Sequence, residues 1–83
     1  MITVQFYTKK NCPLCDNAYQ VLEELQEEYN FTIEERDIYS NDKWLEAYGL
    51  MIPVVQVNGV DIDYGLIEMD SFRNRLLPKL QLK

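Results

Sequence analysis

The sequence contains no histidine at any of its 83 positions. This absence excludes Ser–His and Cys–His catalysis and every metal site built on imidazole. Glycine is also scarce, with three widely spaced residues, and neither a G-x-x-x-x-G-K-S/T run nor a G-x-G-x-x-G run occurs. The chain therefore has no recognisable loop for nucleotide phosphates.

Positive charge is in short supply, because eight Lys and Arg residues stand against fourteen Asp and Glu residues, for a formal net charge of −6. Nucleic-acid binding needs a basic face and anionic membranes attract basic segments, so we expect neither partner. No apolar run approaches the roughly 18–20 residues that span a bilayer, and no signal peptide opens the sequence. We therefore expect a cytoplasmic protein that forms a single domain over residues 1–83.

What the sequence does contain is a pair of cysteines with two residues between them, in Cys12-Pro13-Leu14-Cys15. Alternating apolar residues predict a strand from Ile2 to Tyr7 before the pair, with one face in the core, and helical periodicity predicts a helix from Leu14 to Tyr29. A Cys-x-x-Cys at such a junction is typical of redox sites. In a reducing cytosol the pair is catalytic more often than structural.

The predicted position of Cys12 suits a reactive thiol. The first turn of a helix presents unpaired N–H groups and the positive end of the helix dipole, and both favour the thiolate. Cys15 lies one turn further along and can reach the same sulfur to form a disulfide. Pro13 suits the first turn, where its missing N–H has no intrahelical partner to lose.

The remaining elements follow from periodicity and turn signals. We expect strands over residues 31–36, 52–57 and 60–64, a short helix over 41–48, and a final helix capped by Asp70 or Ser71 and ended or kinked at Pro78. Gly49 fits a left-handed position at the end of the short helix. Asn58-Gly59 predicts an antiparallel hairpin.

The order of elements, βαβαββα, predicts an α/β fold. The first strand–helix–strand unit requires a right-handed parallel crossover. A four-stranded mixed sheet with helices on both faces follows. Trp44, on the apolar side of the short helix, is expected to be a packing residue rather than one that stacks on a ligand. Asp61 and Asp63, at alternate positions of the last strand, are expected to face solvent.

The run from Tyr7 to Cys15 resembles the active-site segment of glutaredoxins, and Met51-Ile52-Pro53-Val54 resembles their cis-proline strand. The element order matches the glutaredoxin form of the thioredoxin-like fold over the whole chain. The run from Cys12 to Asp16 is also similar to a small glutaredoxin-like family of bacterial proteins.

This resemblance implies roles for individual residues. Cys12 would be the attacking cysteine and Cys15 the resolving one, with Pro53 as the cis-proline beside them. The substrate-binding residues would be Lys9, near the thiolate, Ile52, which offers its backbone to the substrate, and Pro53, together with Pro13 and Leu14 between the cysteines.

The implied activity is thiol–disulfide exchange on protein or small-molecule disulfides by a monomer with no bound cofactor and no metal. Glutathione or a flavin reductase would act as the external reductant. Glutaredoxins carry a Gly-Gly after the fourth strand to hold glutathione, whereas this chain has Asp63-Tyr64-Gly65-Leu66 there. We therefore expect poor use of glutathione.

Two other functions stay open at the level of sequence. Two cysteines cannot fill a tetrahedral metal site alone, so Cys12 would bind an iron–sulfur cluster or a metal only in a dimer. The chain would alternatively be a redox-inert interaction module that keeps only the fold.

Overall fold

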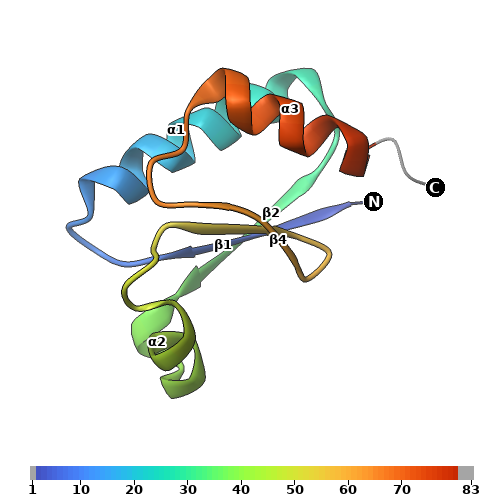
Figure 1. Ribbon diagram of the computed structural model, residues 1–83. Helices are drawn as coiled ribbons and strands as arrows, with labels where there is room; N and C mark the ends of the chain where they lie inside the picture. The colour runs from blue at the N-terminus through green and yellow to red at the C-terminus, as the bar shows by residue number, and fades with distance from the viewer. Residues whose placement is uncertain (1, 81–83) are drawn as a thin grey trace.

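Four strands form one mixed sheet in the order β2-β1-β3-β4 (Figure 1). They are β1 Thr3–Thr8, β2 Thr32–Asp37, β3 Val54–Val57 and β4 Val60–Tyr64. β1 pairs with β2 in parallel, and β3 pairs antiparallel with both β1 and β4. The structure is a computed structural model that describes residues 2–80.

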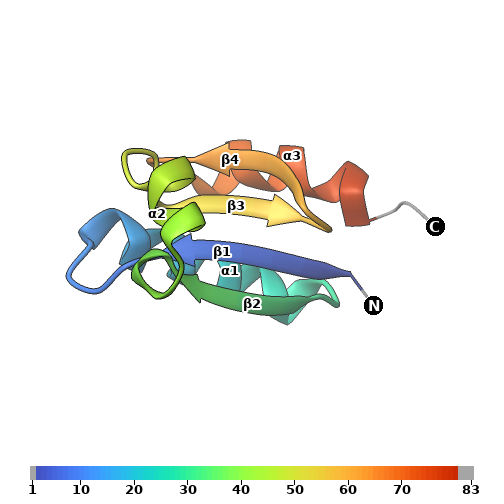
Figure 2. The ribbon, with the colours of Figure 1, turned by 90° about the horizontal axis from the view of Figure 1, so that it is seen from below.

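The helices are α1 Pro13–Glu28, α2 Asp42–Tyr48 and α3 Met69–Leu80, with a 3-10 turn, η1, over Ile38–Ser40. α1 and α3 lie side by side on one face of the sheet, and α2 lies on the opposite face (Figures 1 and 2). The order βαβαββα and the mixed four-stranded sheet confirm the predicted fold class.

The main core lies between the sheet and the pair α1 and α3. Its buried side chains come from all of these elements and include Val4, Phe6, Leu22, Leu25, Val55, Phe72 and Leu76. Burial of each such side chain contributes roughly 1.5–3 kcal/mol. Both cysteines belong to the same cluster, so the redox pair is built into the edge of this core.

β1 is buried on both faces, which corrects the expectation of one buried face. Gln5 and Tyr7 are buried, as are Val4 and Phe6 on the other face. The reason is topological, because β1 is a central strand with helices packed on both sides of the sheet. Tyr7 packs with Ile38 and Val54 in a second, smaller cluster against which Trp44 also packs, as expected of the tryptophan.

The two aspartates of β4 point to different faces. The register is irregular between Val55 and Gln56, so Asp63 lies opposite Val55 and Asp61 opposite Gln56. A bulge of this kind breaks the alternation on which the expectation of two solvent-facing carboxylates depended. Asp63 is instead largely covered and pairs with Arg75 of α3 at 3.3 Å.

Two expectations about helix ends are corrected, although α2 does end at Tyr48 with Gly49 as its C-cap. Gly49 has φ −53 and ψ −33, a right-handed conformation. A Cβ there would lie 2.6 Å from the carbonyl oxygen of Leu45, so close backbone approach explains the glycine. Pro78 does not end α3, which starts at Met69 and continues to Leu80, and Leu80 packs against the main core.

Candidate active site

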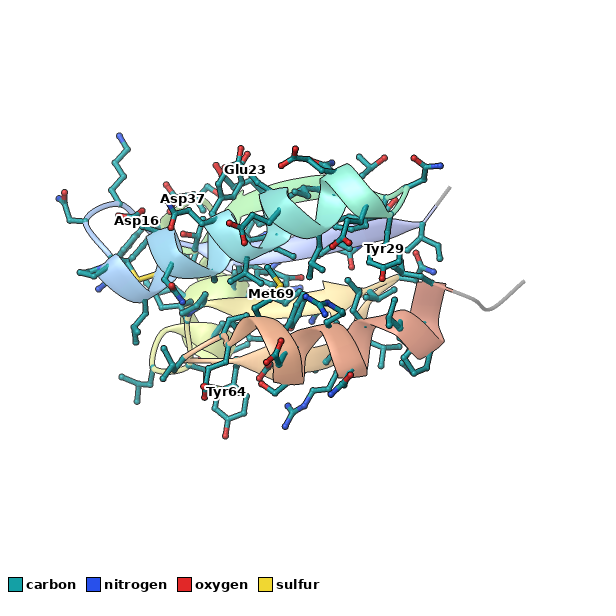
Figure 3. All side chains as sticks on the ribbon, turned by 90° about the horizontal axis from the view of Figure 1, so that it is seen from above. Asp16, Glu23, Tyr29, Asp37, Tyr64 and Met69 are labelled. Carbon is teal, nitrogen blue, oxygen red and sulfur yellow. A yellow bond between two sulfur atoms is a disulfide. The ribbon has the colours of Figure 1, made fainter. Side chains whose placement is uncertain are left out.

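The two cysteines lie where β1 leads into α1. Asn11, with φ 57, turns the chain, and Cys12 is the N-cap of α1. Cys12 and Cys15 form a disulfide, with their Cα atoms 5.2 Å apart (Figure 3). Pro13 occupies the first helical turn, as expected, and loses no hydrogen bond there.

The backbone of α1 bonds directly to the sulfur of Cys12. The N–H of Cys15 donates to Cys12 Sγ at 3.1 Å, and the N–H of Asp16 donates to the carbonyl oxygen of Cys12 at 3.0 Å. The sulfur thus takes the place of a capping oxygen at the positive end of the helix dipole. Both features stabilise negative charge on this sulfur when the disulfide is reduced.

The two cysteines differ slightly in exposure to solvent. Cys12 is 7% exposed and Cys15 is 1% exposed. Cys15 packs within the main core, beside side chains of α1 and the sheet. Cys12 is therefore the more exposed residue of the pair, although Cys15 and not Cys12 lines the groove described below.

The bond between Ile52 and Pro53 is cis, as the resemblance predicts. Pro53 is fully buried, and Ile52 packs against both hydrophobic clusters, including the one that contains the cysteines. The carbonyl oxygen of Pro53 accepts from the N–H of Gly65 at 2.8 Å. This bond joins the cis-proline segment to the loop between β4 and α3.

Three loops meet at the end of the molecule that carries the disulfide, on the left in Figure 1. Each presents an exposed leucine: Leu14 between the cysteines, Leu50 between α2 and β3, and Leu66 between β4 and α3. The last loop is also tied to α1, because Asn17 Nδ2 donates to the carbonyl oxygen of Ile67 at 3.0 Å. The loops at this end of the molecule therefore expose apolar side chains.

On another side of the disulfide lies a groove of about 800 Å³ that Cys15 helps to line. Lys9, Lys10 and Pro13 line it together with the carboxylates of Asp16, Glu35 and Asp37, and the remaining lining residues are Phe6, Thr8, Asn17, Tyr19 and Gln20. Three carboxylates against two lysines leave no excess of positive charge to attract an anion.

The sequence-predicted residues are divided between these regions. Lys9, Pro13 and Cys15 line the groove, whereas Ile52 and Pro53 do not, and Leu14 projects into solvent. Sequence reasoning missed Glu35 and Asp37 as groove residues. The parallel register, with Phe6 opposite Glu35 and Thr8 opposite Asp37, brings them there, and the predicted pairing of the first two strands was the available signal.

Residues 2–80 contain no group of three or more His, Cys, Asp or Glu side chains placed to hold a metal ion. A cluster would therefore need ligands from outside this part of the chain, and the carrier alternative stays a hypothesis. Within the same residues, no helix is both long and apolar enough to cross a bilayer.

Comparison with known proteins identifies the family. A family model described as "Glutaredoxin-like domain (DUF836)" matches residues 3–79. The chain belongs to this glutaredoxin-like family. With the Cys12–Cys15 disulfide at the start of α1, membership supports thiol–disulfide redox chemistry for this protein.

Curated relatives point the same way. Two proteins named "Probable Thioredoxin", from Methanothermobacter thermautotrophicus and Methanothermobacter marburgensis, are each 30% identical to this chain over 63 residues, which is 72% of this chain and 74% of theirs.

Solved thioredoxins share the fold of this glutaredoxin-like chain. A mutant thioredoxin from Halobacterium salinarum superposes with a TM-score of 0.71 at 21% identity, over 99% of this chain and 77% of that one. The oxidised thioredoxin of Plasmodium falciparum gives 0.63 at 21% identity, over 94% and 79%. At this identity the likeness is one of fold, and it agrees with the predicted thioredoxin-like architecture.

Proposed function

We propose that this protein reduces disulfides in peptides and proteins, with Cys12 as the nucleophile and Cys15 as the resolving thiol. The observation that carries the proposal is the bond from the N–H of Cys15 to Cys12 Sγ at the start of α1. It gives Cys12 a donor for thiolate charge that Cys15, buried in the core, does not share.

The reaction proceeds in two exchanges. The Cys12 thiolate attacks one sulfur of the substrate disulfide, a mixed disulfide forms, and the other substrate sulfur leaves as a thiolate that takes a proton from solvent. Cys15 then loses its proton and attacks Cys12 Sγ, which breaks the mixed disulfide and releases the second substrate thiol. Two electrons pass from the dithiol to the substrate, and the protein ends as the Cys12–Cys15 disulfide.

An external donor then returns two electrons and two protons to the pair. We propose a flavin reductase or, less efficiently, glutathione as this donor. All protein groups of the scheme come from one chain, which supports action as a monomer.

The surroundings of Cys12 favour a peptide over glutathione. Leu14, Leu50 and Leu66 offer apolar contact to a polypeptide, and the backbone of Ile52 offers pairing to an extended segment. Glutathione is an anionic tripeptide, and the groove beside Cys15 holds more carboxylates than lysines. Gly65 stands alone where glutaredoxins have two glycines, and the next residue is the exposed Leu66.

Turnover with two substrates and two donors tests the proposal. A short peptide closed by an intrachain disulfide and a mixed disulfide of glutathione are each supplied with thioredoxin reductase or with glutathione and glutathione reductase. We expect the peptide to be reduced faster, with thioredoxin reductase as the better donor. Comparable rates on the glutathione substrate would contradict the proposed preference.

A second measurement tests the assigned nucleophile. Alkylation of the reduced Cys15→Ser variant across pH should show a midpoint below the value of about 8.5 for a free thiol. Reduced Cys12→Ser is the matched control, and its remaining thiol should react more slowly at neutral pH. A faster reaction at Cys15 would reverse the two roles.

A further inference from the structure

A polar network around one buried glutamine lies on the sheet face that α2 covers. Its centre is Gln56 of β3, which is 5% exposed. Gln56 Oε1 accepts from the hydroxyl of Tyr7 at 3.0 Å, and Gln56 Nε2 donates to Asp61 Oδ1 at 2.7 Å and to the hydroxyl oxygen of Tyr48 at 3.0 Å. Each polar atom of this side chain therefore has a partner, which holds the amide in one orientation.

The network extends across the sheet to β2. Arg36 Nη1 donates to the hydroxyl oxygen of Tyr7 at 2.6 Å, and its guanidinium lies over the rings of Tyr7 and Trp44 at 5.4 and 5.2 Å. Strands β2, β1, β3 and β4 thus each contribute one residue. From α2, Trp44 contacts the guanidinium of Arg36 and Tyr48 bonds to Gln56. Bonds of this kind fix position more sharply than apolar packing does.

Tyr48 connects the network to the active site. It is the last residue of α2, and its carbonyl oxygen accepts from the N–H groups of Met51 at 2.9 Å and Ile52 at 3.1 Å. Ile52 precedes the cis-proline, so one residue binds Gln56 through its hydroxyl and the substrate-docking segment through its carbonyl. The Ile52 carbonyl is then the backbone group left to meet an N–H of a substrate.

We propose that Gln56 and Tyr48 are positioning residues for substrate docking at Ile52. Their hydrogen bond fixes the end of α2 on the sheet, and the end of α2 fixes the Ile52 backbone relative to Cys12. Docking groups must be held to within about 0.5 Å to work well. The inference rests on the proposed function, in which a peptide backbone pairs with Ile52.

The chain contains a matched comparator for Gln56. Gln5 is its cross-strand partner in the register of β1 and β3, on the same face of the sheet, and is 8% exposed. Gln5 Oε1 accepts from the N–H of Gly59 at 3.0 Å, in the hairpin between β3 and β4. The two glutamines therefore bond to different segments. Gln5 binds the hairpin between β3 and β4, whereas Gln56 is linked through Tyr48 to the cis-proline segment.

The test compares Gln56→Met with Gln5→Met on two substrates. One is a peptide closed by an intrachain disulfide, which has a backbone to dock, and the other is hydroxyethyl disulfide, which has none. We expect Gln56→Met to raise KM for the peptide about 2- to 10-fold, the equivalent of one hydrogen bond. Its kcat, its turnover of hydroxyethyl disulfide and the pH profile of Cys12 alkylation should stay unchanged, and Gln5→Met should leave all four unchanged.

Tyr48→Phe provides a second, milder variant, since it removes only the hydroxyl and keeps the ring packed on Tyr7 at 4.4 Å. It should shift KM in the same direction as Gln56→Met and speed hydrogen exchange of the Ile52 amide. Equal shifts in Gln5→Met and Gln56→Met, or equal losses on both substrates, would overturn the positioning role. If the wild type reduced neither substrate, the proposed function would fail, and unchanged exchange at Ile52 in Tyr48→Phe would separately overturn this inference.

Discussion

The two faces of the sheet are held by different kinds of interaction. The face under α1 and α3 is an apolar core of Val, Leu and Phe side chains that includes both cysteines. The face under α2 carries a smaller apolar cluster around a hydrogen-bonded network of Arg36, Tyr7, Gln56, Tyr48 and Asp61. Apolar burial stabilises the fold but does not fix the orientation of side chains. The hydrogen bonds of the network orient the side chains that they join, and each adds little net free energy to folding.

This division matches the two needs of the site. The reacting sulfurs need a rigid, water-poor support, and Cys15 obtains it from the apolar face. The proposed docking segment at Ile52 and Pro53 needs a defined position, and the α2 face is hydrogen-bonded to it through Tyr48. We therefore expect the α1 and α3 face to contribute most of the stability and the α2 face to position the proposed docking backbone.

The largest expected effect on stability is truncation on the apolar face. Phe72 of α3 is fully buried in the main core, so Phe72→Ala should lower the free energy of unfolding by about 3–5 kcal/mol. Urea denaturation measures it. Leu66→Ala, at an exposed leucine, is the control and should stay within about 0.5 kcal/mol of the wild type. A loss below about 1 kcal/mol for Phe72→Ala would remove the contrast between the faces.

A smaller loss in the free energy of unfolding is expected for a substitution on the α2 face. Tyr7→Phe keeps the ring but deletes the hydroxyl that joins Arg36 to Gln56, which leaves the buried Gln56 Oε1 without this donor. The expected cost is about 1–3 kcal/mol in the same assay. Tyr39→Phe, which removes the hydroxyl of an exposed tyrosine, is the control. A neutral result for Tyr7→Phe would mean that the network contributes no stability.

The smallest expected effect is a pH dependence that belongs to Tyr7. Burial raises the pKa of Tyr7 above its ordinary value of 10.0, and the guanidinium of Arg36 opposes this only in part. The unfolded chain therefore releases this proton at lower pH than the folded one, and this stabilisation is present below pH 10.0 and lost as pH rises through the folded pKa. Urea denaturation at pH 8 and above pH 10 measures this effect. The free energy of unfolding should fall between the two pH values in the wild type and should fall less in Tyr7→Phe.

Much of the fold was predictable because its signals are local. Asn58 and Gly59 have the positive φ angles that an Asn-Gly hairpin requires, and the apolar stripe of α1 marked the helix to within one residue at each end. The cis bond before Pro53 came from the resemblance alone, since most such bonds are trans.

The features that the sequence did not predict depend on contacts between residues that are distant along the chain. Nothing near Gln56 in the sequence indicates that Tyr7 and Tyr48 would bond to it, because these residues meet only through strand pairing and the placement of α2. The bulge that separates Asp61 from Asp63 has no local signal either. In the same way, Glu35 reaches the groove beside Cys15 only through the parallel pairing of β1 and β2.

Trapping the mixed disulfide tests whether Cys12 is the nucleophile. Reduced Cys15→Ser is mixed with a peptide disulfide and analysed by mass spectrometry after proteolysis, with reduced Cys12→Ser treated in parallel. We expect a stable mixed disulfide between the peptide and Cys12 in Cys15→Ser and little adduct in Cys12→Ser. An adduct that forms mainly on Cys15 of the second variant, or on neither, would contradict the assignment of Cys12 as the nucleophile.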